Sequence, residues 1–380
     1  MQHRLIALLI FLMTANASAC MWDYDTLRDE QRGLPGVFEI LTGRYEKRSE
    51  FFYRDRIAKM RALLTTDPNN QPAIDNLAVA LFRVGQHDEA IATTLDKEKR
   101  FPDQYTTSSN LATFYMLTGD SASAVPLLEK ALRINPNAHF GREKYQLMLA
   151  KFLLSAKAAQ IYPTEDFLGA DPFASRYPGT TEPAEMEPRP NPLFIHRNWS
   201  KAADLDSEGA AALQGILGMI RFGTDQSPDL WYALGNLLLQ KGDRNLAVRA
   251  YARAIETKHP RSKDVETVKD AAESSIADDA PNDLLIQREL WAGHVWADSY
   301  MAFTDELIRA GKDPEDESNF AAFYQKAGKQ TPALGWDWHD WIPAWGSVTA
   351  LIAYTVLGLL GALILIRVAR LIRRKLQAVP

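Results

Sequence analysis

The chain has 380 residues, of which 46% are hydrophobic, and its formal net charge at pH 7 is −5. This length accommodates two domains besides terminal segments, and the negative net charge argues against nucleic acid as a partner. The sequence holds one cysteine, which excludes an internal disulfide framework and a zinc site with several cysteine ligands.

Residues 1–19 are predicted to be a secretory signal peptide. Arg4 precedes an apolar stretch of nine residues, from Leu5 to Met13, and small residues follow it. A basic start, an apolar run and a small-residue end are typical of a cleaved export signal. A helix that spans a bilayer needs about 20 residues, so this stretch is too short to remain as an anchor. The protein is therefore expected to be exported.

Cys20 follows the predicted cleavage point and opens an N-terminal segment, residues 20–36. Ordinary signal peptidase would read the small side chains of Ala17 and Ala19, whereas lipoprotein signal peptidase would leave a lipid on Cys20. The second interpretation resembles a bacterial lipobox, although Ala17 stands where leucine is usual. An unmodified thiol, open to an intermolecular disulfide in an oxidising compartment, is the third. The sequence leaves these interpretations open, and Cys20 is the candidate lipidation site.

Residues 37–161 contain a repeat with a period of about 34 residues, which is typical of a helical solenoid. The two full units are residues 71–104 and 105–138. Small residues at the crossing of two helices allow close packing, glycine at the turn permits a positive φ, and proline ends the second helix. The residues that recur at this spacing are Pro68, Pro102 and Pro136, Leu77 and Leu111, Ala78 and Ala112, Gly85 and Gly119, and Ala90 and Ala124.

These residues resemble the tetratricopeptide repeat family, and the resemblance implies an all-α fold, an α-solenoid of helix hairpins. Residues 49–68 fit the second helix of a preceding unit, with Ser49 as its N-cap. Residues 138–159 fit a capping helix, because terminal repeats of a solenoid are usually atypical. The first block is therefore expected to cover residues 37–161.

A second helical block is predicted after a proline-rich linker. The linker, residues 162–200, contains seven prolines between positions 162 and 198. Residues 228–261 resemble the same repeat family through Trp231, Leu234, Gly235, Leu238, Gly242, Ala247, Tyr251 and Ala254. Helical spacing of apolar residues before and after this unit extends the second block over residues 201–326.

The C-terminal part is predicted to anchor the protein in a membrane. Residues 327–345 include four tryptophans, and residues 346–366 form an uncharged run that would span roughly 30 Å as a helix. The five basic residues of the tail, residues 367–380, indicate a cytoplasmic C-terminus, so the ectodomain would be periplasmic or at the cell surface. Gly358 and Ala362 would let two such helices approach closely as a homodimer contact.

No catalytic motif supports an enzyme. The sequence lacks a Gly-x-Ser-x-Gly elbow, a phosphate-binding glycine loop, a dinucleotide fingerprint and a His-Glu-x-x-His pair, and no cofactor or metal is predicted. A basic cluster stands out in residues 44–61, which is either a solvated face balanced by nearby acids or a surface for an acidic partner. Its members are Arg44, Lys47, Arg48, Arg54, Arg56, Lys59 and Arg61.

The family resemblance also implies a concave groove, lined by the first helix of each unit, that receives a peptide. Asn76, Asn110 and Lys144 follow one another at the repeat period and would stack along this groove. Asp75 and Glu143 place acids where a clamp for a terminal carboxylate would need bases, so that specificity is not expected. The predicted groove residues are Asn76, Val79, Arg83, Asn110, Thr113, Met116, Phe140 and Lys144.

Three hypotheses about function follow. The first is a membrane-anchored protein outside the cytoplasm that binds proteins or peptides as a scaffold or assembly factor of the cell envelope. The alternative from another class is an enzyme with its active site in helices 282–326 or in the N-terminal Cys-Met-Trp-Asp-Tyr-Asp segment. The third is a spacer whose groove binds its own linker.

Overall fold

The computed structural model describes Met21, Asp23 and residues 34–173, 207–276 and 280–327. Within these residues the chain is helical and has no strand, so the all-α prediction is confirmed there. The helices are α2 (Val37–Thr42), α3 (Glu50–Thr66), α4 (Gln71–Arg83), α5 (His87–Arg100), α6 (Tyr105–Leu117), α7 (Ser121–Ile134), α8 (Arg142–Ala159), α10 (Ser207–Phe222), α11 (Pro228–Lys241), α12 (Arg244–Glu256), α13 (Ser262–Ser274), α14 (Asp283–Arg309) and α15 (Ala321–Ala327), with 3₁₀ turns η1 (Ala138–Gly141) and η2 (Glu317–Phe320).

The chain divides into two compact units, residues 1–325 and 326–380. The second unit lies almost entirely outside the described residues, and with it lie the predicted tryptophan-rich segment, the predicted span at 346–366 and the basic tail. The predicted signal peptide and Cys20 also lie outside them. Within the described part of the chain, no helix combines the length and apolar character that crossing a membrane requires.

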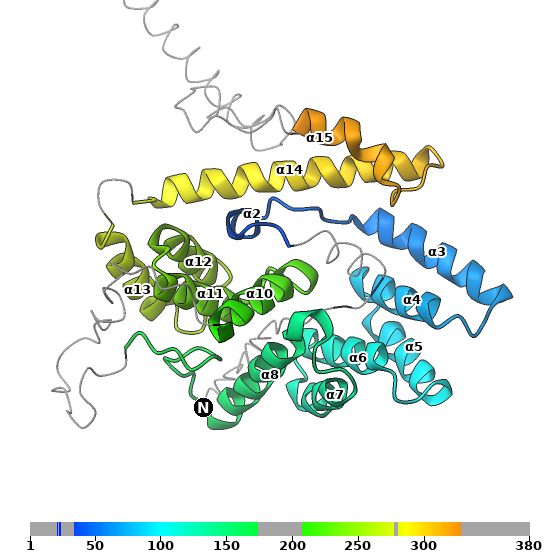
Figure 1. Cartoon of the computed structure of the whole chain (residues 1–380), viewed down its shortest axis with the longest axis horizontal. Coiled ribbons are helices and arrows are strands. Elements are labelled where there is room, and N and C mark those ends of the chain that lie inside the picture. The colour runs from blue at the N-terminus through cyan, green and yellow to red at the C-terminus, as the bar shows by residue number, and fades with distance from the viewer. Residues whose placement is uncertain (1–20, 22, 24–33, 174–206, 277–279, 328–380) are drawn as a thin grey trace, which may run out of the picture. The chain divides into compact units, whose positions relative to one another are not determined.

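Consecutive helices pack as pairs from α3 to α8, as Figure 1 shows. Ser49 caps α3, because its hydroxyl accepts a hydrogen bond from the Phe52 backbone N–H at 3.0 Å. Gly85 and Gly119 lie in the turns inside the two full repeats, at φ 81° and 83°. A side chain at this φ would be strained, so the turns need glycine.

The second group of helices continues the same stack. Helix α8 packs on α10, α10 on α11, α11 on α12, and α12 on α13. The alanines predicted at the helix crossings, among them Ala90, Ala124 and Ala247, are fully buried. Trp231, at the start of α11, is also fully buried and receives the Arg253 guanidinium over its ring at 5.0 Å.

Helix α14 links parts of the stack that are distant in sequence. It contacts α2, α3 and α12 (Figure 1). Glu289 on α14 pairs with Arg249 on α12 at 2.7 Å, and Asp305 near its end accepts a hydrogen bond from Ser49 at 2.5 Å. The short helix α2 lies against α10, α12 and α14. The described helices therefore make contacts beyond those between neighbours in a solenoid.

Candidate functional site

The eight residues predicted for a peptide groove lie at different depths in the first block. By exposure, Val79, Asn110, Thr113 and Met116 are buried, Asn76 and Arg83 are half-buried, Lys144 is exposed, and the side chain of Phe140 in η1 is outside the described part. Of the seven whose side chains are described, three are therefore at least partly exposed in this conformation, and the groove stays a prediction.

Side chains from α8 pack against the inner face of α6. Gln146 Nε2 donates a hydrogen bond to Thr113 Oγ1 at 3.3 Å, and both side chains are fully buried. One turn earlier on α8, Arg142 is 1% exposed and places its guanidinium 5.0 Å from the centre of the Phe222 ring. A peptide could reach Thr113 only by displacing contacts that hold the chain's own helices together.

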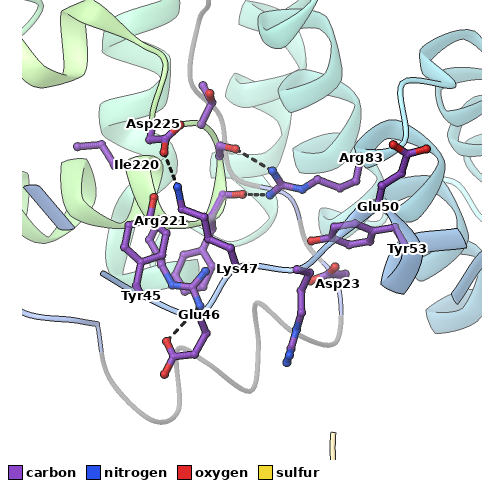
Figure 2. Close-up of a pocket in the computed structure, with 14 residues that line it drawn as sticks. Asp23, Tyr45, Glu46, Lys47, Glu50, Tyr53, Arg83, Ile220, Arg221 and Asp225 are labelled. Carbon is purple, nitrogen blue, oxygen red and sulfur yellow. Dashed lines mark hydrogen bonds and ion pairs between the residues drawn. The ribbon is translucent and has the colours of Figure 1, made fainter. Parts of the chain in front are cut away.

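Arg83, at the end of α4, holds the chain's own backbone. Its Nη1 donates to the carbonyl oxygen of Gly223 at 3.0 Å, and its Nη2 donates to that of Phe222 at 2.5 Å, as the dashed lines in Figure 2 show. The loop between α10 and α11 is therefore seated against the end of α4. A guanidinium recognises main-chain carbonyls without reading side chains, which is the chemistry that an extended peptide would require.

A pocket of about 310 Å³ lies beside this contact (Figure 2). Inside it, Lys47 forms an ion pair with Asp225 at 2.8 Å. Burial alone would lower the pKa of Lys47, but electrostatic interactions with Tyr45 and Asp225 and a hydrogen bond to Asp225 outweigh it, and the pKa is raised. Burial likewise opposes ionisation of Asp225, yet Lys47 brings the pKa of its carboxyl down to about 2. Both groups therefore stay charged at neutral pH, which suits a structural pair and not proton transfer.

Residues 162–173, the first part of the predicted linker, lie against one face of α11. The Tyr162 hydroxyl donates to the Asp229 carboxylate, and the Tyr232 hydroxyl donates to the carbonyl oxygen of Thr164 at 2.9 Å. Asp229 and Tyr232 are three residues apart, so they share a face of the helix. The repeat at α11 thus binds a non-helical segment of its own chain, which contains turns, through side-chain and main-chain contacts.

The same face continues one turn further along α11. Asn236 Nδ2 donates to Asp166 Oδ2 at 2.8 Å, while Asn236 Oδ1 accepts from the Tyr251 hydroxyl at 2.8 Å. Asp166 is 3% exposed, and the next residue, Phe167, is 6% exposed and belongs to the core. This part of the predicted linker is therefore an integral part of the folded chain, while residues 174–200 lie outside the described part.

Three titratable groups are buried where this segment meets α11 and α12. Burial raises the pKa of the Asp166 carboxyl to about 6, despite the hydrogen bond from Asn236. Burial also raises the pKa of the Asp229 carboxyl to about 6. The His259 imidazole lies 3.9 Å from Asp229, and burial, with the charge of Arg261 second, lowers its pKa to about 4. These groups titrate in the folded protein between pH 4 and 6.

Replacing Asp229 by asparagine is expected to change the pH dependence of stability. The folded pKa of Asp229 lies above the unfolded value, so its contribution is full below about pH 4 and is lost as the pH rises through about 6. His259 acts oppositely, since its contribution is lost as the pH falls toward 4. Relative to the wild type, Asp229→Asn should therefore gain about 2 kcal/mol between pH 4 and 7. Urea unfolding across this range measures the difference.

The control for this experiment is Asp96→Asn, because Asp96 is exposed on α5. Loss of its exposed ion pair with Arg100 should change the free energy of unfolding by less than about 1 kcal/mol. An Asp229→Asn profile parallel to the wild type would contradict the burial of an ionisable carboxylate at this position.

The predicted basic cluster is largely neutralised within the chain. Five of its seven members form ion pairs with carboxylates, and Arg48 donates a hydrogen bond to the Tyr300 hydroxyl at 3.1 Å. The pairs are Lys47 with Asp225, Arg54 with Glu50, Arg56 with Asp23 and Glu315, Lys59 with Asp55, and Arg61 with Glu89. This arrangement favours the interpretation of a balanced face over that of a surface for an acidic partner.

The two regions suggested for the active site of an enzyme, the N-terminal segment and residues 282–326, each contribute residues to a pocket. Asp23 lines the pocket shown in Figure 2, and residues 308 and 311–315 line a second pocket of about 630 Å³ beside α3. The charged side chains there include Arg56 and Glu315, which pair with each other. The described residues contain no group of three histidine, cysteine or acidic side chains that could hold a metal ion.

The contact face of α11 was not predicted from the sequence. Asp229, Tyr232 and Asn236 fall within the predicted repeat unit, at spacings of three and four residues. Polar side chains at these spacings share a face, so the pattern was present, but the same residues would also suit a solvated helix. The pattern does not reveal which segment lies against this face, because residues 162–173 have no repeat signal.

Comparison with known families agrees with the repeat pattern. A tetratricopeptide repeat model matches residues 107–138 and 228–258. The first match covers α6 and α7, and the second covers α11 and α12. No curated protein matches the chain. The chain therefore carries two tetratricopeptide repeat segments within a helical array. Repeats of this kind generally bind protein partners and are typically non-catalytic. The two segments thus indicate a role in protein interaction.

Proposed function

We propose that this protein is exported, anchored in a membrane, and binds another protein through its helical repeats as a scaffold or assembly factor of the cell envelope. The observation that carries the proposal is the match of two segments to the tetratricopeptide repeat, set in one stack of helix pairs. The proposed export and anchoring rest on the sequence of residues 1–19 and 346–366.

The contacts inside the repeats support recognition of a non-helical segment through its main chain. Arg83 and Tyr232 each donate to main-chain carbonyl oxygens of segments that lie against the repeats. Main-chain hydrogen bonds provide affinity in peptide recognition, while pockets for side chains provide specificity. A partner segment would use the same kind of donor groups at positions that remain accessible.

Two predicted groove residues outside the contact with Phe222 and Gly223 are exposed at least in part. Lys144 is exposed on α8, and its ion pair with Glu208 at 2.8 Å is itself exposed, so a partner carboxylate could replace it at little cost. Asn76 is half-buried on α4. Asn110 is fully buried, so its substitution would test packing and not binding. The experiment should therefore alter Asn76 and Lys144.

The test is a crosslinking pull-down of the full chain from native membranes in a mild detergent. The variant Asn76→Ala/Lys144→Glu should lose at least one specific protein partner that the wild type retains. The control is Lys157→Glu, which reverses an exposed charge on the opposite side of α8. Circular dichroism confirms that all three forms are folded.

Two results would count against the proposal. Capture of the same partners by both variants would place binding outside the predicted groove. Absence of any specific partner for the folded wild type would favour a spacer that binds only its own linker. Reading the mature N-terminal mass from the same sample decides between cleavage with and without acylation of Cys20.

A further inference from the structure

The first two described residues of the chain, Met21 and Asp23, are both buried in the first block. Met21 is 2% exposed and Asp23 is 5% exposed. The ends of a domain usually stay poorly ordered unless specific contacts hold them. These two side chains therefore occupy a seat on the first repeats, and the side chains around them show which chemistry the seat accepts.

The seat for Met21 is apolar. Met21 belongs to one hydrophobic cluster with side chains from α3, α4 and α6, among them Ile57, Leu77, Phe82 and Phe114. The rings of Phe82 and Phe114 stack there at a centroid distance of 4.5 Å. A flexible thioether side chain fits an irregular apolar gap of this kind. The seat therefore favours an apolar side chain at this position.

The seat for Asp23 is a guanidinium that other side chains already hold in place. Arg56 on α3 is buried, its guanidinium lies 4.6 Å from the centre of the Phe52 ring, and it pairs with Glu315. Its Nη1 lies 3.6 Å from Asp23 Oδ2. At this distance the two groups form an ion pair without a direct hydrogen bond. The seat thus favours a carboxylate two residues after the apolar side chain, and a carboxylate that came closer would bind more strongly.

The ion pair of Arg56 with Asp23 can be approached from two sides. Asp23 lines the pocket of about 310 Å³ in Figure 2, and Arg56 lines the second pocket of about 630 Å³. Ten residues separate Asp23 from Leu34, the next described residue. A connection of this length keeps the chain's own segment near the seat even after it has left it. Met21 and Asp23 are therefore placed as a tethered occupant.

We propose that Met21 and Asp23 are the chain's own ligand for a binding site on the first block, and that this site takes a partner segment with an apolar side chain two residues before a carboxylate. The inference rests on the proposed function and deepens it, because it states which kind of segment the repeats bind. Without the partner, the chain's own segment keeps the apolar cluster out of water. A partner has to compete with this segment, which lowers its apparent affinity.

A peptide added to the full chain tests this site. The probe is a fluorescein-labelled peptide of residues 20–25 with Cys20→Ser, and fluorescence anisotropy in detergent measures its binding. The chain variant Met21→Ser/Asp23→Asn weakens the chain's own ligand. It should bind the peptide about tenfold or more tightly than the wild type, in which the tethered segment competes at a millimolar effective concentration. Asp23→Asn alone, which keeps the buried methionine, should give an intermediate affinity.

Matched peptides and a matched chain variant identify the contacts. A peptide with Met21→Ser and a peptide with Asp23→Asn should each bind the double variant about tenfold more weakly than the natural sequence does. The chain variant Asp96→Asn, which alters an exposed aspartate on α5, should bind the peptide as the wild type does. Circular dichroism confirms that every chain variant is folded.

Three results would overturn the inference. They are folded variants that bind no peptide at about 1 mM, equal binding by the wild type and both variants, and substituted peptides that bind as well as the natural one. None of these results bears on the pull-down, which alters Asn76 and Lys144. Loss of a partner in the pull-down together with failure here would keep the proposed function and reject this site.

Discussion

Replacing Lys97 by methionine should lower the free energy of unfolding by about 3–5 kcal/mol. The Lys97 ammonium lies 2.7 and 2.6 Å from the two carboxylate oxygens of Asp75, and it donates to Thr106 Oγ1 at 3.0 Å. Lys97 and Asp75 are both buried. Methionine would therefore leave a carboxylate without its counter-ion in a medium of low dielectric constant. Urea unfolding followed by circular dichroism measures the loss.

The pH dependence and a double variant identify the cause. Burial raises the pKa of Asp75 even beside Lys97, so without the lysine the carboxyl should protonate more readily and the loss should shrink at acidic pH. Lys97→Met/Asp75→Leu removes both charges and should recover most of the lost stability. A double variant as unstable as the single one would show that lost packing, and not the orphaned charge, is responsible.

Replacing Arg56 by methionine is expected to cost a similar amount, about 3 kcal/mol or more. Arg56 is 7% exposed on α3, and it pairs with Glu315 and, at 3.6 Å, with Asp23. Its guanidinium also lies 4.6 Å from the centre of the Phe52 ring. Since the three charged groups come from three distant parts of the sequence, the variant should loosen the contacts that Asp23 and the loop after α14 make with α3. Limited proteolysis of these segments and urea unfolding measure the effect.

Arg54→Met is the matched control, because it removes an arginine of the same helix whose side chain is 61% exposed. The ion pair of Arg54 with Glu50 is solvated, so its loss should cost less than about 1 kcal/mol. Equal destabilisation by the two variants would mean that the burial of Arg56 has no energetic role.

The repeats could be predicted from the sequence because their determinants are local. Proline at the end of the second helix, glycine at the turn and alanine at the crossing all act within a single repeat unit. The turn glycines Gly85 and Gly119 adopt the positive φ that this pattern requires. The burial of Ala90 and Ala124 follows from the same spacing. Local patterns thus determined the element types and the all-α fold of the described residues.

Local patterns could not predict which parts of the chain lie against the predicted groove residues. The repeat period places Asn76, Asn110 and Lys144 on equivalent faces, but it does not say what lies against each face. Arg83 contacts a loop 140 residues further along the chain, and Asn236 contacts a segment 70 residues before it. Such partners leave no periodic trace, because each contact occurs only once. A residue's face can be predicted from spacing, whereas its burial depends on the tertiary fold.

The length of α14 limits how this chain can evolve. In a solenoid whose units touch only their neighbours, a repeat can be duplicated or lost with little effect elsewhere. Here α14 has 27 residues, or about 40 Å, and it is tied to α12 through Glu289 and to the start of α3 through Asp305. A duplicated unit between α3 and α12 would move these attachment points apart and break one of them. The attachments of α14 therefore fix the number of repeat units between α3 and α12. Simpler solenoids can gain or lose units, whereas this protein cannot do so without breaking a contact of α14.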